Sequence, residues 1–493
     1  MAIYKHGTYG EFAQSVGQTA TQTATTAVYV GAAPVNLIRG YADAGIVNRP
    51  IKLESMAAAK SLMGYSDAWG SFSLCEAFKA HFDNGAGNVG PIVAINVLDP
   101  AIHKKEPETT TPITFTNGQA TIHSDTIILD TLVLADKVEG KDFTISYDFD
   151  RSMVIISSIG ETKITGQINV TYSEVDPSKV VADQIIGGVT SAGIYSGLGA
   201  VPLVYQDIGL IPNVIAAPGW SEDPKGYAAM INAGTKINGH WDAMAIADIP
   251  LVGTGKTPVD TIDKAKSWKA ENGYTNERTK VCWPQAKAQG GELYHISTLT
   301  VVNMQAVDAT HDGVPMETPS NKAVPIVQQY FGDNATNAGF DQMAANALNA
   351  DGITTVCFFG GLWVLWGPHT AAYKHGSVSD SRAIFDNSLR MMMHITNSFQ
   401  QEWASTIDKP MTRALADTIK NREQEKLDAL AAIGALIGEP SVRFVESANP
   451  ISEITEGNFI WDSLVTPTPP WKSGTMRVSY STAGFTIYSG EGA

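Results

Sequence analysis

Apolar residues follow two spacings along the chain, helical in some segments and continuous or alternating in others. Between about residues 71 and 81 they recur every three or four positions, which predicts a helix. Apolar runs at 92–97 (IVAINV), 213–217 (NVIAA) and 241–249 (WDAMAIADI) predict strands. A helical segment at 223–238 separates the last two. Strands that alternate with helices in this way predict a mainly parallel, covered sheet.

A different texture begins at Lys104. Its first residues, Lys104–Thr111 (KKEPETTT), have the composition of a linker. An Asn117-Gly118 pair between two short β-like segments predicts a hairpin. Residues 143–149 alternate apolar and polar side chains, as a strand with one buried face does. We therefore expect a small β-sandwich or barrel at 104–179, inserted into the α/β unit.

The C-terminal part of the chain mixes helices and short strands. The apolar stretch 353–367 (ITTVCFFGGLWVLWG) is interrupted by two glycines and predicts a buried strand with a turn. Two long helices are expected at 381–403 and 412–436. Further expected elements are helices near 292–305 and 340–350, and strands at 279–283, 442–445, 476–480 and 485–488.

These elements predict an α/β core, an α+β C-terminal domain and an inserted all-β domain. The first 24 residues are polar and lack periodicity, so an extended arm is expected there. The expected domains are an N-terminal arm at 1–24, a core at 25–103 and 180–370, the inserted domain at 104–179, and a C-terminal domain with a terminal strand arm at 371–493.

The composition is that of a folded globular protein, with 44% hydrophobic and 17% charged residues in a chain of 493. Its formal net charge of −16 leaves no basic patch large enough to neutralise phosphates, which argues against nucleic acid as a partner. Three widely spaced cysteines argue against a disulfide framework and for folding in a reducing cytosol. Because neither a secretory signal nor a membrane-spanning stretch is visible, we expect a soluble chain without a membrane anchor.

One segment resembles part of a phosphate-binding loop. Gly253-Thr-Gly-Lys-Thr257 follows a predicted strand, but the full motif needs a glycine where this chain has Pro250, and no helix-forming run follows. Proline also removes one N–H group of the kind that contacts phosphate. We therefore expect no nucleotide site in this loop.

Other candidate chemistry is weaker. Four residues of metal-binding type, at 295, 308, 311 and 312, have a spacing that matches no helical or hairpin pair, and polar loop groups are the simpler interpretation. No G-x-S-x-G elbow is present. We expect no enzyme activity, no metal and no cofactor. The aromatic residues that could stack on a ligand are expected in the core instead: Phe358, Phe359, Trp363 and Trp366.

Several short segments stand in a definite order along the chain, among them DATHDGVPMETPSNK at 308–322, LNADGI at 348–353 and WGPHT at 366–370. The earlier members of the ordered set are 27–33, 82–85, 215–219 and 245–250. In this order they resemble the contractile tail sheath proteins of bacteriophages and related injection systems. The resemblance covers about 25–100 and 210–490, whereas the insertion at 104–179 lies outside it.

The resemblance implies a structural subunit that forms a six-start helical sleeve around an inner tube. It implies further partners in baseplate and tail terminator proteins, and contraction by rearrangement of compact domains, without nucleotide, to drive the tube through a target cell envelope. It places the protein in a virion tail or an extracellular contractile particle, after assembly in the cytoplasm of a host bacterium. It leaves open whether the machine is a phage, a tail-like bacteriocin or another injection device.

Both ends of the chain are expected to link subunits. Short strands on flexible leads have unpaired edges, which become stable when they pair with a neighbouring sheet. The expected linking residues are Tyr4, Tyr9, Phe12, Met476, Val478, Tyr480, Phe485, Ile487 and Tyr488. The basic residues of the helix at 412–436 are expected to face the inner tube: Arg413, Lys420, Arg422 and Lys426. Two simpler interpretations stay open, namely strands that pair within their own domain and a charged helix that is only a solvated face.

Two other functions also stay open. A virion shell protein or adhesin would use the insertion at 104–179 to bind a glycan or a protein, and a P-loop ATPase would use Gly253–Thr257. A sheath protein forms regular tubes without a ligand, an ATPase binds nucleotide as a small oligomer, and an adhesin stays discrete. Electron microscopy and nucleotide binding therefore separate the three.

Overall fold

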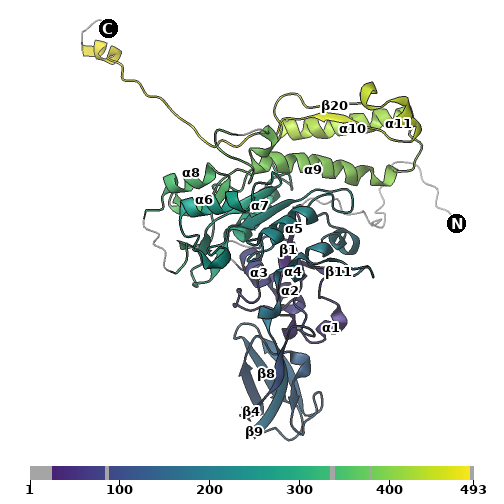
Figure 1. Ribbon diagram of the computed structural model, residues 1–493, viewed down its shortest axis with the longest axis vertical. Coiled ribbons are helices and arrows are strands. Elements are labelled where there is room, and N and C mark those ends of the chain that lie inside the picture. Colours follow the sequence, from purple (N-terminus) through teal and green to yellow (C-terminus); the bar gives the residue numbers. More distant parts are fainter. Residues whose placement is uncertain (1–24, 84–87, 334–338, 378–379, 489–493) are drawn as a thin grey trace, which may run out of the picture.

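The computed structural model describes residues 25–83, 88–333, 339–377 and 380–488, and in these residues the largest element is an eight-stranded sheet (Figure 1). Continuous apolar runs form its central strands, which are buried along their whole length. In spatial order the strands are β19 (Leu362–Trp366), β18 (Ile353–Phe359), β14 (Thr279–Cys282), β13 (Met244–Asp248), β12 (Val214–Ala216), β1 (Ala27–Gly31), β3 (Ile92–Asn96) and β2 (Pro50–Leu53).

The strands from β18 to β3 run parallel, and an antiparallel strand lies at each edge of the described sheet. The expected mainly parallel sheet is therefore confirmed. The parallel strands are joined by helices, as parallel pairing requires, because a short turn cannot return the chain to the same end of the sheet.

Helices cover both faces of the sheet, and the alternation of side chains along β14 separates the two sides. Val281 packs in one apolar cluster with residues of α5 (Pro224–Ala233), α6 (Ile262–Glu271) and α8 (Gln342–Asn349). Cys282 points the opposite way and contacts Thr300 of α7 (Ile296–Ala309), beside which α3 (Leu74–Phe82) packs.

The helices begin where the sequence supplies a cap. Asp223 accepts a hydrogen bond from a main-chain N–H at the start of α5, and Thr261 does the same for α6. α5 ends earlier than the expected residue 238, at Gly234, where the chain turns back toward β13. Smaller elements are α1 (Tyr41–Ala44), α2 (Met56–Leu62), α4 (Ala182–Ile186), β10 (Gly188–Val189), β11 (Tyr195–Ser196), β15 (Gln285–Lys287), β16 (Leu293–His295) and β17 (Gln328–Tyr330).

A β-sandwich projects from the end of this sheet unit (Figure 1, bottom). One of its sheets contains β4 (Lys104–Phe115), β9 (Gly166–Val175) and β6 (Val133–Leu134), and the other contains β5 (Gln119–His123), β8 (Met153–Ser158) and β7 (Phe143–Asp148). Side chains between the two sheets, including Phe115, Phe143 and Ile156, form an apolar core of their own.

One local expectation for this insertion is wrong, and a second is met only in part. Lys104–Thr111, expected as a linker, is the exposed part of β4 and pairs with β9. Because most of its side chains face solvent, this strand has the polarity of a linker. The turn at Asn117-Gly118 is present, but Thr116 and Gln119 form only an isolated bridge, and the flanking strands enter different sheets. The expected turn is therefore formed, with reciprocal main-chain hydrogen bonds between Thr116 and Gln119, but the hairpin pairing ends at this one residue pair and the turn is a corner of the sandwich.

The last part of the chain packs on the opposite side of the sheet from the sandwich (Figure 1, top). We call the following elements the C-terminal unit: α9 (Asp386–Trp403), α10 (Arg413–Ala432), β20 (Ser441–Arg443), α11 (Ile451–Thr455) and β21 (Asp462–Leu464). Met391, Leu427 and Leu436 lie in its apolar core. In the described part of the chain, no helix is both long and apolar enough to cross a membrane.

Candidate assembly interfaces

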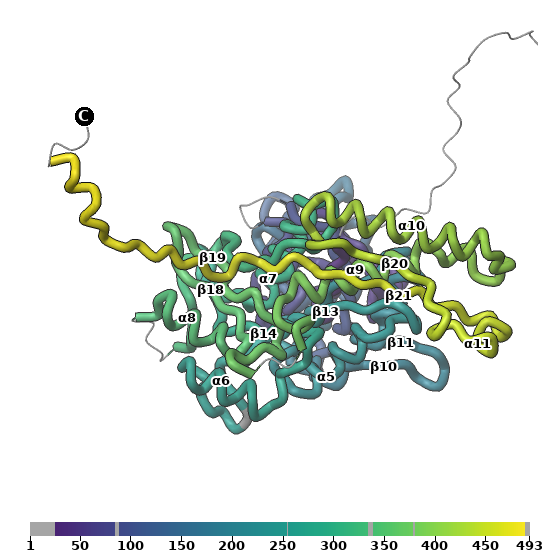
Figure 2. Tube along the Cα trace, turned by 90° about the horizontal axis from the view of Figure 1, so that it is seen from above, coloured from purple at the N-terminus to yellow at the C-terminus, as the bar shows by residue number. Residues whose placement is uncertain are grey.

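After β21 the chain runs across the top of the molecule as a tail, which we define as residues 466–488 (Figure 2). Its first part is attached to the C-terminal unit. The N–H of Thr468 donates a hydrogen bond of 3.0 Å to the carbonyl oxygen of Ala435, three residues after α10, and its own carbonyl oxygen accepts one of 3.1 Å from Asn387. The ammonium group of Lys472 lies 5.8 Å from the centre of the Tyr373 ring. The tail is therefore fixed to the body up to about residue 472.

Beyond this point the tail carries large apolar side chains into solvent. Met476, Val478 and Tyr480 are 86%, 81% and 81% exposed, and Ile487 and Tyr488 are similarly exposed. The first three alternate with other residues, so an extended chain would present them on one face. Exposed apolar residues gathered on one segment indicate an interaction site.

The two strands expected in the tail are not formed in the single chain. Residues 476–480 have no regular secondary structure, and Ala483–Tyr488, which contains the expected strand Phe485–Tyr488, is a short 3-10 helix. A strand needs partners for its N–H and C=O groups, and the tail pairs with no strand of the described chain. Strand pairing with a neighbouring subunit stays a prediction.

The described chain begins at Thr25, close to α7 and α9. The Thr25 hydroxyl donates to Asp308 of α7, and the side-chain amide of Gln305 donates to the Thr25 carbonyl oxygen at 2.6 Å. The first described residue is therefore held firmly in the body. Three expected linking residues lie outside the described part of the chain: Tyr4, Tyr9 and Phe12.

A buried ion pair joins α9 to the large sheet. The ammonium group of Lys280, in β14, lies 2.6 Å from the carboxylate of Asp386 at the start of α9, and both side chains are 0% exposed. The same ammonium group donates to the carbonyl oxygens of Gly367 at 2.6 Å and His369 at 3.2 Å. The hydroxyl of Thr318 donates to the Asp386 carboxylate at 3.1 Å. Both charges are therefore paired and hydrogen-bonded, the condition under which a buried ion pair persists.

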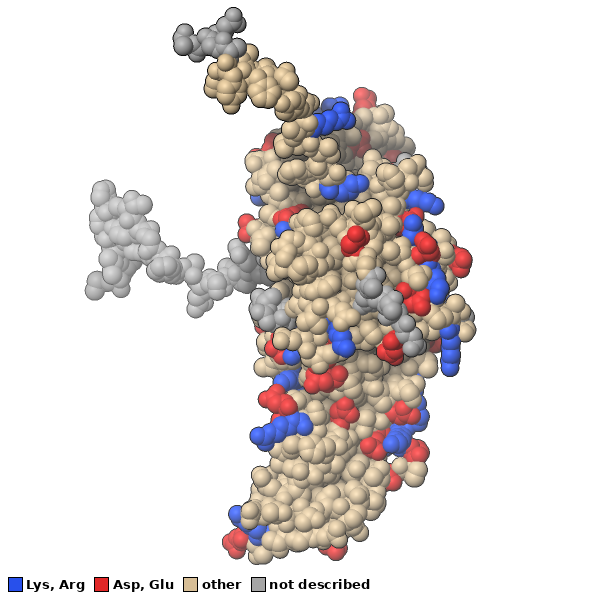
Figure 3. All heavy atoms as spheres, turned by 90° about the vertical axis from the view of Figure 1, so that its left-hand side faces the viewer, with Lys and Arg blue, Asp and Glu red and all other residues tan. Residues whose placement is uncertain are grey.

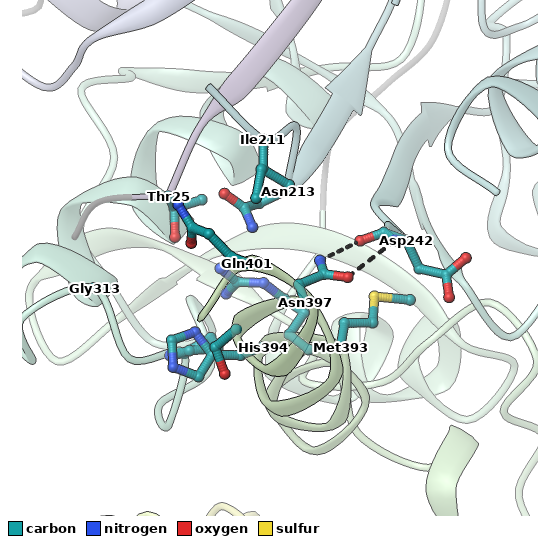
Figure 4. Close-up of a pocket in the computed structure, with 12 residues that line it drawn as sticks. Thr25, Ile211, Asn213, Asp242, Gly313, Met393, His394, Asn397 and Gln401 are labelled. Carbon is teal, nitrogen blue, oxygen red and sulfur yellow. Dashed lines mark hydrogen bonds between the residues drawn. The ribbon is translucent and has the colours of Figure 1, made fainter. Parts of the chain in front are cut away.

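Two further contacts lie along the same helix. Arg390 forms a second buried ion pair with Asp308 of α7. The side-chain amide of Asn397 donates to the Asp242 carbonyl oxygen at 2.9 Å and accepts from the Asp242 N–H at 3.1 Å (Figure 4). Burial lowers the pKa of His394, which lies between them. We call these contacts, together with the Lys280–Asp386 pair, the α9 joint.

The basic residues expected to face a tube lie on α10. Thr412 caps this helix by accepting a hydrogen bond from the N–H of Leu415. Three of the four form ion pairs within the chain: Arg413–Asp417 at 3.1 Å, Arg422–Glu402 at 3.4 Å and Lys426–Glu423 at 2.9 Å. Lys420 has no ion pair among the described residues. The tube-facing role of this helix stays a prediction.

β20 and β21 form a two-stranded ribbon beside α10. The outer edge of β20 faces this helix, because the side-chain oxygen of Gln424 accepts a hydrogen bond of 2.9 Å from the Val442 N–H. β21 has no second strand partner in the described chain, so its outer edge is open. The sequence predicted β20 but not β21, whose three residues, Asp-Ser-Leu, are too few and too polar to indicate a strand.

The aromatic stretch expected in the core is only partly buried. β18 and β19 form an antiparallel hairpin, in which the side chains of Trp363 and Trp366 are half-buried. Phe358, close to the turn, is 60% exposed, so the expectation fails at the end of the hairpin. The reason is that the hairpin extends past its neighbour β14, which pairs only with its first residues.

The two candidate sites that the sequence argued against, a phosphate-binding loop and a metal site, are not formed in the described part of the chain. Gly253–Thr257 contains a short turn, and α6 begins only at Ile262, so no helix opens directly from this loop. The metal-type residues have separate partners: His295 with Glu76, Asp308 with Arg390, and His311 with Glu317. Among the described residues, no group of three or more His, Cys, Asp or Glu is placed to hold a metal ion.

A buried charged cluster that the sequence did not indicate lies at the end of β13. Asp248 accepts a hydrogen bond of 3.0 Å from the Ser297 N–H, and burial raises its pKa to about 7. His295 pairs with Glu76 at 2.7 Å and lies 3.5 Å from Glu222. Burial by itself would lower the pKa of His295, but these carboxylates outweigh it and raise the pKa well above its usual value.

Comparison with known proteins gives consistent names. The tail sheath protein of Burkholderia phage BcepMu is 26% identical to this chain over 482 residues, which cover 92% of this chain and 94% of that protein. The major tail sheath protein of Serratia phage KSP20 is 23% identical over 309 residues, 62% of this chain and 73% of that protein. Neither name is that of an enzyme. No protein-family model matches the chain.

Two solved structures share the fold. A chain of the anti-feeding prophage baseplate, symmetrised six-fold, superposes with a TM-score of 0.56 and 13% identity, over 98% of this chain and all of that chain. A chain of the sheath complex of an extracellular contractile injection system in its contracted state gives a TM-score of 0.53 and 10% identity, over the same shares. With the near full-length match to a phage relative, this likeness confirms the resemblance drawn from the ordered segments. The chain is therefore similar over nearly its whole length to the tail sheath proteins of contractile phage tails and injection systems, which are structural subunits.

Proposed function

We propose that the chain forms a helical sleeve around an inner tube, by pairing its tail with the C-terminal unit of a neighbouring copy. The observation that carries this proposal is the tail itself. Met476, Val478 and Tyr480 alternate along a segment that has no strand partner among the described residues of its own chain. β21 presents an open strand edge. Each copy therefore supplies both a donor and an acceptor for β-strand addition.

The positions of donor and acceptor favour a chain of copies over a closed pair. The tail leaves the molecule on one side, whereas α11 and the β20–β21 ribbon lie toward the other (Figure 2). A contact between two different surfaces is head-to-tail, and repetition of such a contact produces a ring or a helix. A helical sleeve is the arrangement that continues to accept further copies.

Contraction would change the packing between copies while each copy keeps its own fold. The α9 joint supports this, because its two buried ion pairs hold the C-terminal unit and the large sheet together. Breaking such a pair costs about 3–5 kcal/mol, since it leaves a charge buried without a partner. The tail beyond residue 472 lies outside this body and would keep the copies linked as they move.

The remaining contacts of the sleeve follow from the same family. We place residues 1–24 with the tail as a second link, α10 toward the tube, and baseplate and tail terminator proteins at the two ends. The sleeve would have six starts, in keeping with the six-fold baseplate that contains one structural relative. It would act in a phage tail or an extracellular contractile particle after assembly in the host cytoplasm, without enzyme activity.

Electron microscopy of the purified full chain, alone and with the tube protein, tests the proposal. Hollow cylinders with a regular repeat are expected. A chain that ends at Ser473 should melt at the same temperature as the full chain, because residues 476–488 are exposed, and should form no cylinders. Regular cylinders from this shortened chain would refute the role of the tail.

A pair of single substitutions makes the test independent of length. Val478→Asp places a charge on the apolar face of the tail, whereas Ser479→Asp places the same charge on the other face of an extended segment. The first should prevent cylinders and the second should permit them. Equal behaviour of the two variants would show that the tail does not bind as a strand.

A further inference from the structure

The β18–β19 hairpin projects beyond the sheet to which it belongs. β18 pairs with β14 only through Ile353 and Thr354. From Thr355 onward its strand partner among the described residues is β19. The turn at Gly360-Gly361 has two positive φ angles, +60° and +87°, which glycine adopts without strain. The last residues of the hairpin are therefore a two-stranded ribbon that extends into solvent.

This ribbon carries large apolar side chains on both faces. Phe358, Phe359 and Leu362 are 60%, 39% and 58% exposed. Phe359 and Leu362 are a cross-strand pair on one face, and Phe358 lies on the other, where its ring is 5.7 Å from that of Trp363. We call Phe358–Leu362 the hairpin tip. A short ribbon with exposed aromatic residues is a surface that proteins normally cover.

The hairpin lies beside the start of the tail. Phe359 and Trp366 line one wall of a groove of about 720 Å³, and Pro470, Trp471 and Lys472 of the tail line another. The side of the molecule from which the tail leaves carries dispersed charges of both signs with broad uncharged areas between them (Figure 3). Residues 353–366 contain no charged residue. A partner at the hairpin tip would therefore bind through apolar contact.

We propose that the hairpin tip is a second contact between copies of this chain, made on the neighbour that receives the tail. Residues 474–480 can span at most about 25 Å when extended. A copy that binds Met476–Tyr480 must therefore lie within about that distance of the groove, which places it next to the hairpin tip. The inference rests on the proposed function, because it needs the tail to link two copies, and it adds a surface outside the tail.

Protection of a thiol tests this contact in the assembled sleeve. The three native cysteines, Cys75, Cys282 and Cys357, are buried, so Leu362→Cys introduces an exposed thiol at the hairpin tip. Its reaction with a maleimide should slow at least about tenfold when the full chain forms cylinders. Val133→Cys in the β-sandwich, where the native side chain is 59% exposed, is the matched control and should react at nearly the same rate in both states.

A substitution series provides the second measurement. Phe358→Ser with Leu362→Ser should raise the protein concentration needed for cylinders about tenfold or more, with an unchanged melting temperature, since apolar burial at the contact is lost. The matched control is Val133→Ser with Val138→Ser, two residues that are equally exposed on the sandwich. If the double serine variant at the tip proves unstable, Leu362→Lys alone makes the same prediction.

The outcomes distinguish this inference from the proposed function. If the native chain forms no cylinders, alone or with the tube protein, both are overturned. If cylinders form and the new thiol at position 362 reacts as fast as in the free chain, the hairpin contact is refuted while the role of the tail stands. Slower reaction confined to position 362 supports the contact between copies.

Discussion

Replacing Lys280 by methionine should destabilise the folded chain by about 3–5 kcal/mol, although the new side chain has nearly the same length. The ammonium group is 0% exposed and donates to the Asp386 carboxylate and to two main-chain carbonyl oxygens. Methionine donates no hydrogen bond, so a fully buried carboxylate loses its counterion and the two carbonyl oxygens lose a donor. Each buried polar group without a partner costs about 1–3 kcal/mol, which supports the same range.

A second substitution shows whether charge is the cause. Asp386→Asn keeps the shape of the side chain, which contacts the hydroxyl of Thr318 and the N–H of Asn387, but removes its charge. In the Lys280→Met background it should therefore restore part of the lost stability, even though it is destabilising in the native chain. Two substitutions that touch one ion pair are expected to be strongly non-additive in this way.

The assay is thermal and urea unfolding of the full chain, monitored by tryptophan fluorescence at a concentration below that at which cylinders form. Lys60→Met is the control. Lys60 also forms an ion pair, with Asp150, whose side chain is 84% exposed, and its loss should leave the unfolding curve unchanged. The reasoning is refuted if Lys280→Met unfolds like the native chain, or if Asp386→Asn adds to its damage.

Four further predictions concern other sites. Gly352→Ala should lower the free energy of unfolding by about 2–5 kcal/mol, because φ is +65° and a Cβ would lie 2.5 Å from a carbonyl oxygen. Gly360→Ala, at φ +60° in open space, should lower it by only about 1–2 kcal/mol. Urea unfolding compares the two variants, and equal costs would contradict the steric argument. Asp248 retains a proton in the folded state that the unfolded chain loses near pH 4, so the stability that this group contributes falls as pH rises to about 7. Asp248→Asn should therefore gain stability relative to the native chain between about pH 5 and pH 8. A difference in melting temperature that stays constant with pH would refute this. His295 acts in the same direction at higher pH, because its raised pKa gives stability that is full below about pH 6.5 and is lost as pH rises through the folded pKa, so His295→Gln should flatten the alkaline part of the same melting profile. On the proposed function, Lys420→Glu should weaken co-sedimentation of the chain with tube protein without changing its melting temperature, and unchanged co-sedimentation would argue against a tube contact at this residue.

The strands of the large sheet could be predicted because burial on both faces makes their sequences continuously apolar. The runs at 92–97 and 213–217 contain β3 and β12 for this reason. Helix starts were also predictable where a side chain caps the first turn, as Thr412 does for α10. β4 was missed because its exposed side chains leave no apolar pattern, and pairing with β9 is the property that makes it a strand.

The α9 joint could not be predicted because its partners are distant in the sequence. Lys280 lies 106 positions from Asp386, and Arg390 lies 82 positions from Asp308. A lysine within a buried strand gives no local indication of which carboxylate neutralises it. For the tail, the local pattern was visible but the partner was not. Its alternating residues predicted strands, but a strand exists only with its partner, and the part of the chain that the structure describes supplies none to residues 476–480.

The molecule divides into a part that stays fixed, where charges are buried, and a part that can rearrange, where apolar side chains are exposed. Both partners of the Lys280–Asp386 and Arg390–Asp308 ion pairs belong to one copy of the chain. A rearrangement that separated α9 from the sheet would therefore expose these charges or leave them buried without a partner. Residues 476–488 of the tail and the hairpin tip carry exposed apolar side chains in the single copy, so contacts through them can be exchanged at little cost to the fold. Substitutions in the α9 joint should therefore lower the melting temperature of the free chain, and substitutions at residues 476–488 or in the hairpin tip should change assembly alone. A substitution at residues 476–488 that lowered the melting temperature of the free chain would show that this division is wrong.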